Sequence, residues 1–236
     1  MTSRGSEVRV LYRPPHKAAI VKWYNRVLVM LSRRFDSRWW HQNHIIITDM
    51  EQTRKFLQGT HPFEQIRHPM PHQDMMGEML AIKHLAVTRS DTHTRGWSKL
   101  CLHGHGLHEL RSYLDYDGPL EGFDRRYRWS DEIRDDIPHT RAFFDDFRPF
   151  EHLRRIRLQW LEPGGYLEPH RDTDHGTDRR VTINIAVNNP PGCEMRFGDT
   201  VVPFQAGTMF MIDSTQEHSV HNDSDQARAH LIVDGR

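Results

Sequence analysis

Apolar positions recur with two different periods along this chain, and the change of period separates an N-terminal part from a C-terminal part. Between residues 17 and 34 the apolar positions are 20, 21, 24, 27, 28 and 31, the spacing of a helix with one buried stripe. The other elements expected before residue 95 are strands over 7–12 and 44–48, a helix over 49–58 with Asp49 as its N-cap, and a Pro- and His-rich loop over 61–74. The stretch 78–88 fits a helix or a strand.

The middle of the chain predicts few regular elements. Residues 97–102 predict a strand, and the glycines of residues 103–106 (HGHG) predict a turn after it. We expect residues 113–136 to be mostly irregular, because Asp, Arg and Tyr are dense there and two glycines interrupt them. A helix over 145–153 would then lead into the C-terminal part.

The C-terminal part contains eight short strand candidates separated by turn signals. They are residues 157–161, 166–172, 180–187, 194–197, 200–204, 208–212, 218–222 and 229–233. Many short, regularly interrupted strands are typical of an antiparallel barrel or jelly roll. We therefore predict an all-β core with flanking helices over residues 96–236. Residues 1–95 would form an α/β elaboration packed on that core, so that the chain is one structural unit.

Composition restricts the partners of this chain. It has 236 residues, with 32 basic and 32 acidic side chains and no formal net charge, which gives no support to binding of nucleic acid or of an anionic membrane. The most apolar stretch, 18–31, is too short and too often interrupted to cross a membrane. Cys101 and Cys193 are too few for a disulfide framework, which favours reduced thiols and a cytoplasmic location. The oligomeric state stays open.

The chemistry of the chain is concentrated around His170 and Asp172. These residues are two apart, so on an extended segment both side chains project from one face. His218 follows at a distance and completes a set of two imidazoles and one carboxylate. Such a set suits Fe(II) and leaves open positions for a bidentate co-substrate and dioxygen. The alternative is a surface turn in which the Asp accepts hydrogen bonds from backbone donors.

A buried cation is expected ten residues after His218. Arg228 starts an otherwise apolar strand, and its charge cannot be lost by deprotonation, so inside a barrel it needs an anionic partner. A dicarboxylic co-substrate would provide one, and the alternative is a salt bridge to Asp213 or Asp234. The other candidates, His103 and His105, could bind a second metal or a substrate at the barrel rim, although a solvated glycine turn explains them as well.

Several motifs in order resemble the aspartyl/asparaginyl β-hydroxylase family of Fe(II)- and 2-oxoglutarate-dependent oxygenases. They are residues 161–172 (LEPGGYLEPHRD), 189–193 (NPPGC), 207–213 (GTMFMID), 217–222 (EHSVHN) and 228–234 (RAHLIVD), with 137–140 (IPHT) upstream. The resemblance covers residues 137–235 and implies a double-stranded β-helix, a cupin-like jelly roll. It also implies that His170, Asp172 and His218 bind Fe(II) and that Arg228 binds the distal carboxylate of 2-oxoglutarate.

The resemblance places further residues near the co-substrate, namely Gln159, Thr182 and Asn184. Relatives often carry an Arg and a His two apart on this strand, and here either Arg180 with Thr182 or Thr182 with Asn184 takes their places. The implied reaction is hydroxylation of a C–H bond in a free amino acid, a peptide residue or a related small molecule, with O2 as oxidant and ascorbate as a supporting reductant. Because Asp172 is present, hydroxylation is favoured over halogenation. A non-redox, cupin-like isomerase or binding module is the alternative.

Overall fold

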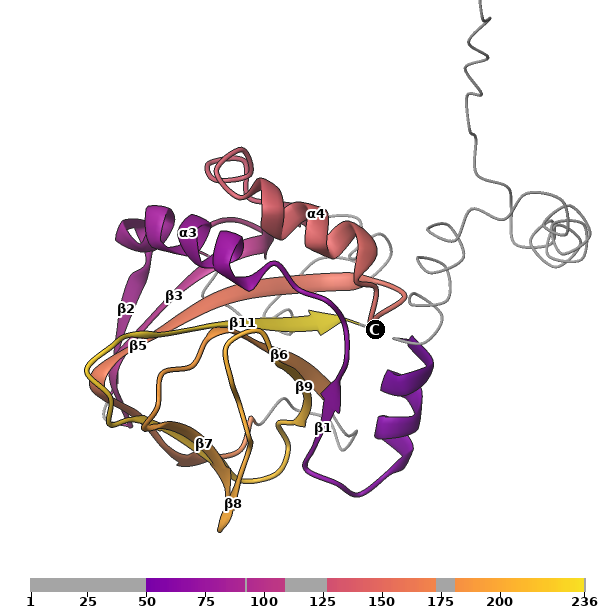
Figure 1. Ribbon diagram of the computed structural model, residues 1–236, viewed down its shortest axis with the longest axis vertical. Helices are drawn as coiled ribbons and strands as arrows, with labels where there is room; N and C mark the ends of the chain where they lie inside the picture. The colour runs from indigo at the N-terminus through magenta and orange to yellow at the C-terminus, as the bar shows by residue number, and fades with distance from the viewer. Residues whose placement is uncertain (1–49, 92, 109–126, 173–180, 236) are drawn as a thin grey trace, which may run out of the picture. The chain divides into compact units, whose positions relative to one another are not determined.

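The described part of the chain comprises residues 50–91, 93–108, 127–172 and 181–235 of a computed structural model (Figure 1). All of it belongs to one compact unit, Gln42–Arg236. The strands expected over 7–12 and 44–48 and the helix expected over 17–34 lie outside the described residues. The division of the chain after residue 95 stays a prediction.

Short helices precede and interrupt a series of antiparallel strands. Residues 50–58 are helical, as expected, and the other helices are α3 (His72–Ile82), the 3-10 turn η1 (Lys83–Leu85) and α4 (Pro138–Asp146). The strands are β1 (Phe63–Ile66), β2 (Val87–Asp91), β3 (Thr94–Gly104), β4 (Arg128–Trp129), β5 (Leu153–His170), β6 (Val181–Asn188), β7 (Cys193–Phe197), β8 (Thr200–Val201), β9 (Met209–Asp213), β10 (His218–Asn222) and β11 (Arg228–Gly235).

One long strand, β5, joins the two layers of the sheet. The hydrogen-bonded order is β1-β9-β6-β11-β5-β10-β7-β8, with β3 paired to β5. The first half of β5 pairs with β11, whereas its last residues, from Tyr166 onward, pair with β10. Figure 1 shows β7 and β8 across from the layer that holds β11, β5 and β6. The predicted double-stranded β-helix with flanking helices is therefore confirmed.

In the layer formed by β11, β5 and β6, successive side chains of each strand point alternately to the two faces of the sheet, and both faces are buried. Ile183 and Ile185 on β6, like Leu158 and Trp160 on β5, belong to the core that includes α3 and α4. The helices cover this outer face of the sheet (Figure 1). Residues of the opposite parity point into the barrel, where Phe210 and its neighbours form a second apolar cluster. Polar residues of that same parity line the site described below.

The helix before the barrel begins earlier than expected. The prediction over 145–153 was wrong: α4 spans Pro138–Asp146, and Pro138 occupies its first turn, where a missing N–H costs nothing. The N–H groups of His139 and Thr140, which lie in the first turn of α4, donate to the buried Glu78 carboxylate of α3, and the Thr140 hydroxyl donates to the same group. The cap is thus a tertiary contact, which local sequence cannot reveal.

The structure also decides four other local predictions, two of which need correction. The expected loop over 61–74 contains β1, which pairs with β9, and the first turn of α3. The ambiguous stretch 78–88 holds a helix end, the turn η1 and the start of β2 in succession. Residues 157–161 and 166–170 of two strand candidates are parts of the single strand β5, because the glycines between them bend the strand without ending it, whereas residues 171 and 172 follow the strand. The strand expected over 97–102 is confirmed within β3.

No helix in the described ranges is long and apolar enough to cross a membrane. Cys101 and Cys193 are both buried thiols.

Candidate metal and co-substrate site

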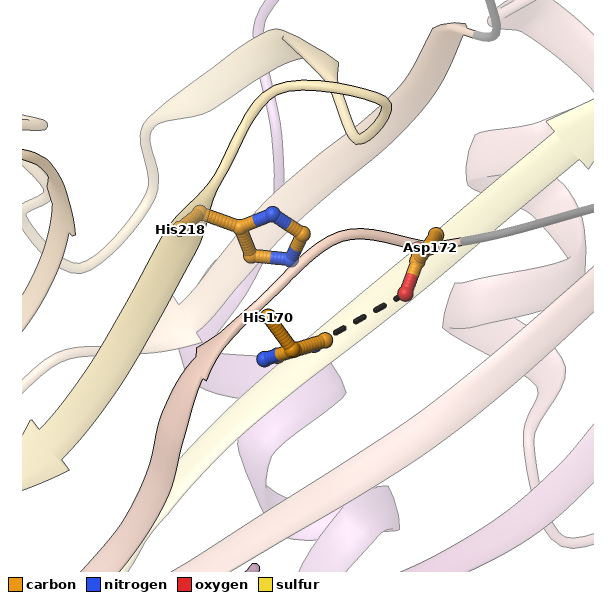
Figure 2. A group of neighbouring side chains, drawn as sticks. All are labelled: His170, Asp172 and His218. Carbon is orange, nitrogen blue, oxygen red and sulfur yellow. Dashed lines mark ion pairs between the residues drawn. The ribbon is translucent and has the colours of Figure 1, made fainter.

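Three side chains from two separate parts of the sequence converge at the end of β5 (Figure 2). His170 is the last residue of β5, Asp172 follows the strand, and His218 is the first residue of β10. One ligand atom from each residue lies within 4.8 Å of the others. His170 and His218 are direct cross-strand partners, and their ring centroids are 4.4 Å apart. The sheet register therefore assembles the set predicted from the sequence, and it is the one potential metal-binding cluster among the described residues.

In both imidazoles the ring nitrogen Nδ1 contacts a backbone carbonyl oxygen. His170 Nδ1 lies 2.7 Å from the carbonyl oxygen of Glu168, and His218 Nδ1 lies 2.9 Å from that of Gln216. Since a carbonyl only accepts, each Nδ1 carries the proton and each Nε2 offers a lone pair. His170 Nε2 is 3.7 Å from a carboxylate oxygen of Asp172 (dashed in Figure 2). This arrangement of carbonyl, imidazole and free Nε2 is typical of histidines that bind metals.

Burial keeps His218 neutral at physiological pH. Desolvation lowers the pKa of its imidazole below 6.5, and the hydrogen bond to Gln216 and the charge of Asp172 oppose that shift only in part. A neutral imidazole is the form that binds a metal. His218 is buried, whereas His170 is half-buried and Asp172 is exposed, so the triad is open on one side.

A cavity of about 170 Å³ lies against the triad inside the barrel. Its lining comes from strands of both layers and comprises Trp97, Lys99, Arg157, Gln159, Leu167, His170, Asp172, Thr182, Asn184, Met195, Ile212, Ser214, His218, Val220, Arg228 and Ile232. The lining is mixed, with polar and charged groups among the aliphatic ones. Gln159, Thr182 and Asn184 all belong to it, as the resemblance to relatives implies. Arg180 lies outside the described residues.

Arg228 is a buried cation at this cavity. It is 4 % exposed, and burial lowers the pKa of its guanidinium to about 10, which leaves it charged at neutral pH. Within the described ranges Arg228 forms no salt bridge, and its hydrogen bond goes to the neutral ring of His230. The alternative of a partner in Asp234 was wrong, because that carboxylate pairs with Arg155 and Arg157.

The carboxylate of Asp213 does not compensate Arg228 either. It accepts hydrogen bonds from Thr215 and Gln216 in the turn after β9. A cation without a nearby anion among the described residues is suited to an anionic ligand that enters the cavity.

The other histidine candidates take no part in the triad. His103 contacts the Arg154 carbonyl oxygen and the ring of Trp129, and His105 stacks on Tyr127. His221 lies near the carboxylates of Glu194 and Asp223. His221 is therefore no part of the ligand set.

The sequence reasoning missed other polar residues at the site. Ser214 lines the cavity, and its hydroxyl is buried without a hydrogen-bond partner in the described part of the protein. His230 contacts Arg228 from two positions further along β11. For His230 a signal was present, because alternate residues of a strand share one face. Ser214 had no such signal, since it lies in a turn.

Two solved structures that are similar to this chain are prolyl hydroxylases by their descriptions. A prolyl hydroxylase from Trichoplax adhaerens, solved in complex with a hypoxia inducible factor peptide fragment, aligns with a TM-score of 0.53 at 11% identity over 86% of this chain and 94% of that chain. A prolyl-4-hydroxylase from Pseudomonas putida aligns with a TM-score of 0.47 at 17% identity over 78% and 96% of the two chains. The likeness to the Trichoplax adhaerens protein, at 11% identity, shows the fold alone.

Sequence comparison identifies the family more directly. No curated protein matches the chain. The family model described as aspartyl/asparaginyl beta-hydroxylase matches residues 62–236, which contain the triad, the cavity and nearly all of the described structure. The chain therefore belongs to the aspartyl/asparaginyl beta-hydroxylase family, a hydroxylase family among the Fe(II)- and 2-oxoglutarate-dependent oxygenases.

Proposed function

We propose that this enzyme hydroxylates a C–H bond of a polar substrate, with His170, Asp172 and His218 as the ligands of Fe(II) and Arg228 as the anchor of 2-oxoglutarate. The observation that carries these assignments is a facial ligand set and a buried, uncompensated guanidinium on the same cavity. The family match favours this reaction over the non-redox, cupin-like alternative.

The three ligands fit iron by their donor atoms. Two neutral imidazoles and one carboxylate bind a divalent first-row metal on one face and leave the remaining positions for other ligands. The carbonyl oxygens of Glu168 and Gln216 hold both rings with Nε2 directed away from the backbone. Asp172 contributes one negative charge, so the bound metal would keep a net positive charge that attracts an anionic chelator.

The cavity fits 2-oxoglutarate by its charge. Arg228 presents planar N–H donors that match a carboxylate, and its burial strengthens such a contact. Gln159 and Thr182 line the same cavity and have polar groups that can hydrogen-bond the co-substrate. In this assignment one end of the dicarboxylate chelates iron and the other pairs with Arg228.

When bound together, Fe(II) and 2-oxoglutarate activate dioxygen, and one oxygen atom enters the substrate while the other enters succinate. The balance is R–H, O2 and 2-oxoglutarate giving R–OH, succinate and CO2. The chain's own residues orient the reactants. His170 and His218 are held by backbone contacts, so they would not reorient during the cycle.

The substrate is expected to be polar. Lys99, Arg157 and Ser214 line the cavity beside the groups assigned to iron and co-substrate. Such a lining suits a free amino acid, a residue in a peptide, or a related small molecule better than an apolar one. A mass-spectrometric screen of amino acids and peptides for the gain of one oxygen atom would identify the class. Two buried thiols favour a reducing, cytoplasmic setting for this reaction.

The direct test measures succinate formed from 2-oxoglutarate with Fe(II) and ascorbate, together with Fe(II)-dependent binding of 2-oxoglutarate. The His218→Ala variant should lose iron binding and turnover and keep its fold. His221→Ala is the matched control, since this residue lies on the same strand but contacts Glu194 and Asp223. If the wild type shows neither turnover nor Fe(II)-dependent binding, the proposed function is wrong.

A further inference from the structure

His230 is a fully buried polar residue that the proposed reaction does not use. It is 0 % exposed on β11, two residues after Arg228, and its ring packs edge-on against Phe204 at a centroid distance of 4.7 Å. Nδ1 of His230 lies 2.8 Å from a guanidinium nitrogen of Arg228, and Nε2 lies 3.1 Å from the side-chain oxygen of Asn189. Both ring nitrogens are therefore engaged.

The hydrogen bonds of Asn189 determine which ring nitrogen carries the proton. Its amide nitrogen donates to the carbonyl oxygens of Cys193 and Phe204, at 3.0 and 3.4 Å, so its amide oxygen is the atom that faces His230. An amide oxygen only accepts, and Nε2 of His230 must therefore be the donor. In the neutral ring this leaves a lone pair on Nδ1.

Arg228 uses that lone pair. A guanidinium nitrogen can only donate, which agrees with an accepting Nδ1 on His230. Burial, together with the charge of Arg228, lowers the pKa of His230 well below 6.5, so the ring stays neutral. The side-chain oxygen of Asn184 lies 2.7 Å from the same Nδ1, and its amide nitrogen lies 3.7 Å from the sulfur of Met195. Two acceptors cannot face each other, so we infer that this amide is rotated by 180°, with its nitrogen toward the ring, and shares the Nδ1 lone pair with Arg228.

We propose that His230 is a positioning residue for the co-substrate: its Nδ1 orients the guanidinium of Arg228 through a hydrogen-bond chain anchored on Asn189. This inference rests on the proposed function, because it assigns Arg228 to 2-oxoglutarate. The chain runs from backbone carbonyls through Asn189 and His230 to Arg228.

A neutral acceptor suits this position better than a carboxylate. A carboxylate beside Arg228 would compensate its charge and compete with the anionic ligand. An imidazole accepts one N–H, fixes the plane of the guanidinium and leaves the net positive charge available. Because β11 is buried on both faces, water has little access to replace the imidazole.

The test compares two variants of the Fe(II)-loaded protein under anaerobic conditions. His230→Leu removes the acceptor and keeps an apolar group of moderate size. His230→Asn keeps an acceptor near the place of Nδ1. We expect His230→Leu to weaken 2-oxoglutarate binding by about tenfold or more, the effect of losing one hydrogen bond to a charged group, while the Kd for Fe(II) is unchanged. His230→Asn should recover most of the loss.

Equal losses of 2-oxoglutarate affinity in both variants, or a parallel loss of Fe(II) affinity, would show that His230 only supports the barrel and would overturn the proposal. Unchanged 2-oxoglutarate binding in His230→Leu would overturn it as well. If His230→Leu does not fold, Asn189→Ala tests the same chain, because it removes the acceptor of Nε2 and keeps the ring. Unchanged 2-oxoglutarate binding in that variant overturns the proposal too. Failure of the proposed function itself would be visible in the wild type, as a lack of Fe(II)-dependent 2-oxoglutarate binding.

Discussion

The backbone N–H of Asp172 donates to the carbonyl oxygen of Ser214 at 2.9 Å. This bond ties the segment that follows β5 to the turn between β9 and β10. The next residues of the same turn provide the carbonyl oxygen of Gln216, which accepts from Nδ1 of His218. One turn therefore holds both the carboxylate ligand and the second imidazole of the proposed iron site.

Asp213 shapes that turn, and we expect its removal to weaken metal binding. Its carboxylate accepts from the backbone and hydroxyl of Thr215 and from the side chain of Gln216. Asp213→Ala should raise the Kd for Fe(II) about 10- to 100-fold, as losses of residues that orient metal ligands do. Titration of the metal-free protein with Fe(II) measures this effect. The control is Asp199→Ala, an exposed carboxylate in another turn, which should have no effect.

Arg228 is expected to act on the co-substrate and not on the metal. Arg228→Ala should raise the 2-oxoglutarate requirement at least about tenfold, because it deletes a desolvated, charge-assisted contact. Arg228→Lys keeps the charge but loses the planar fork, so it should fall between the wild type and Arg228→Ala. Both variants should keep the Fe(II) requirement of the wild type. Equal changes in the two requirements would contradict the assigned role.

Much of this site could be predicted because its residues lie at strand ends or next to them. The two-residue spacing of His170 and Asp172 suggested one strand face; in the structure His170 ends β5, Asp172 follows it, and Arg228 opens β11. His218 was predicted as the distant partner because it follows shortly after the strand that ends near Asp213, and in the structure it is the first residue of β10. The family motifs then ordered these pieces correctly along residues 137–235.

The parts of the fold and of the site that could not be predicted depend on contacts between elements that are remote in sequence. Glu78 caps α4 from another helix, and β1 becomes a strand only by pairing with β9. The alternative partners of Arg228 were wrong because Asp234 faces Arg155 and Arg157 across the sheet. The prediction of two strands in place of β5 treated Pro163 and its glycines as a turn, whereas they bend a continuous strand.

The pH dependence of stability should report the neutral state of His230. Burial and Arg228 hold the pKa of this imidazole well below 6.5 in the folded protein, while an unfolded histidine has a pKa of about 6.5. Below pH 6.5 the unfolded chain thus binds a proton that the folded protein does not. The stability that the neutral imidazole of His230 contributes is fully present above pH 6.5. As the pH falls below that value, this stability is lost by up to about 1.4 kcal/mol per pH unit.

Urea unfolding of the metal-free protein between pH 7.5 and 5.5 measures this dependence. His230→Asn lacks the titrating ring, so its free energy of unfolding should fall less steeply with decreasing pH than that of the wild type. His218 has a pKa shift of the same sign, but it contributes to both proteins and does not affect the difference. Parallel profiles would mean that His230 titrates normally in the folded state.

The bend in β5 should require glycine at position 165. A Cβ added to Gly165 would lie 2.7 Å from the carbonyl oxygen of Glu162 and 2.9 Å from that of Arg95, so backbone would have to move. Since β5 connects the layer of β11 to the layer of β10 through this bend, Gly165→Ala should lower the free energy of unfolding by at least about 1–3 kcal/mol. It should also weaken Fe(II) binding, because His170 is the last residue of the same strand.

Gly77→Ala is the matched control: no atom lies within 4 Å of the added Cβ, and an alanine inside α3 should stabilise the protein by up to about 1 kcal/mol. Chemical denaturation of the two variants separates a steric requirement at the bend from a general effect of replacing glycine, and equal stabilities would show that the strand can bend without it.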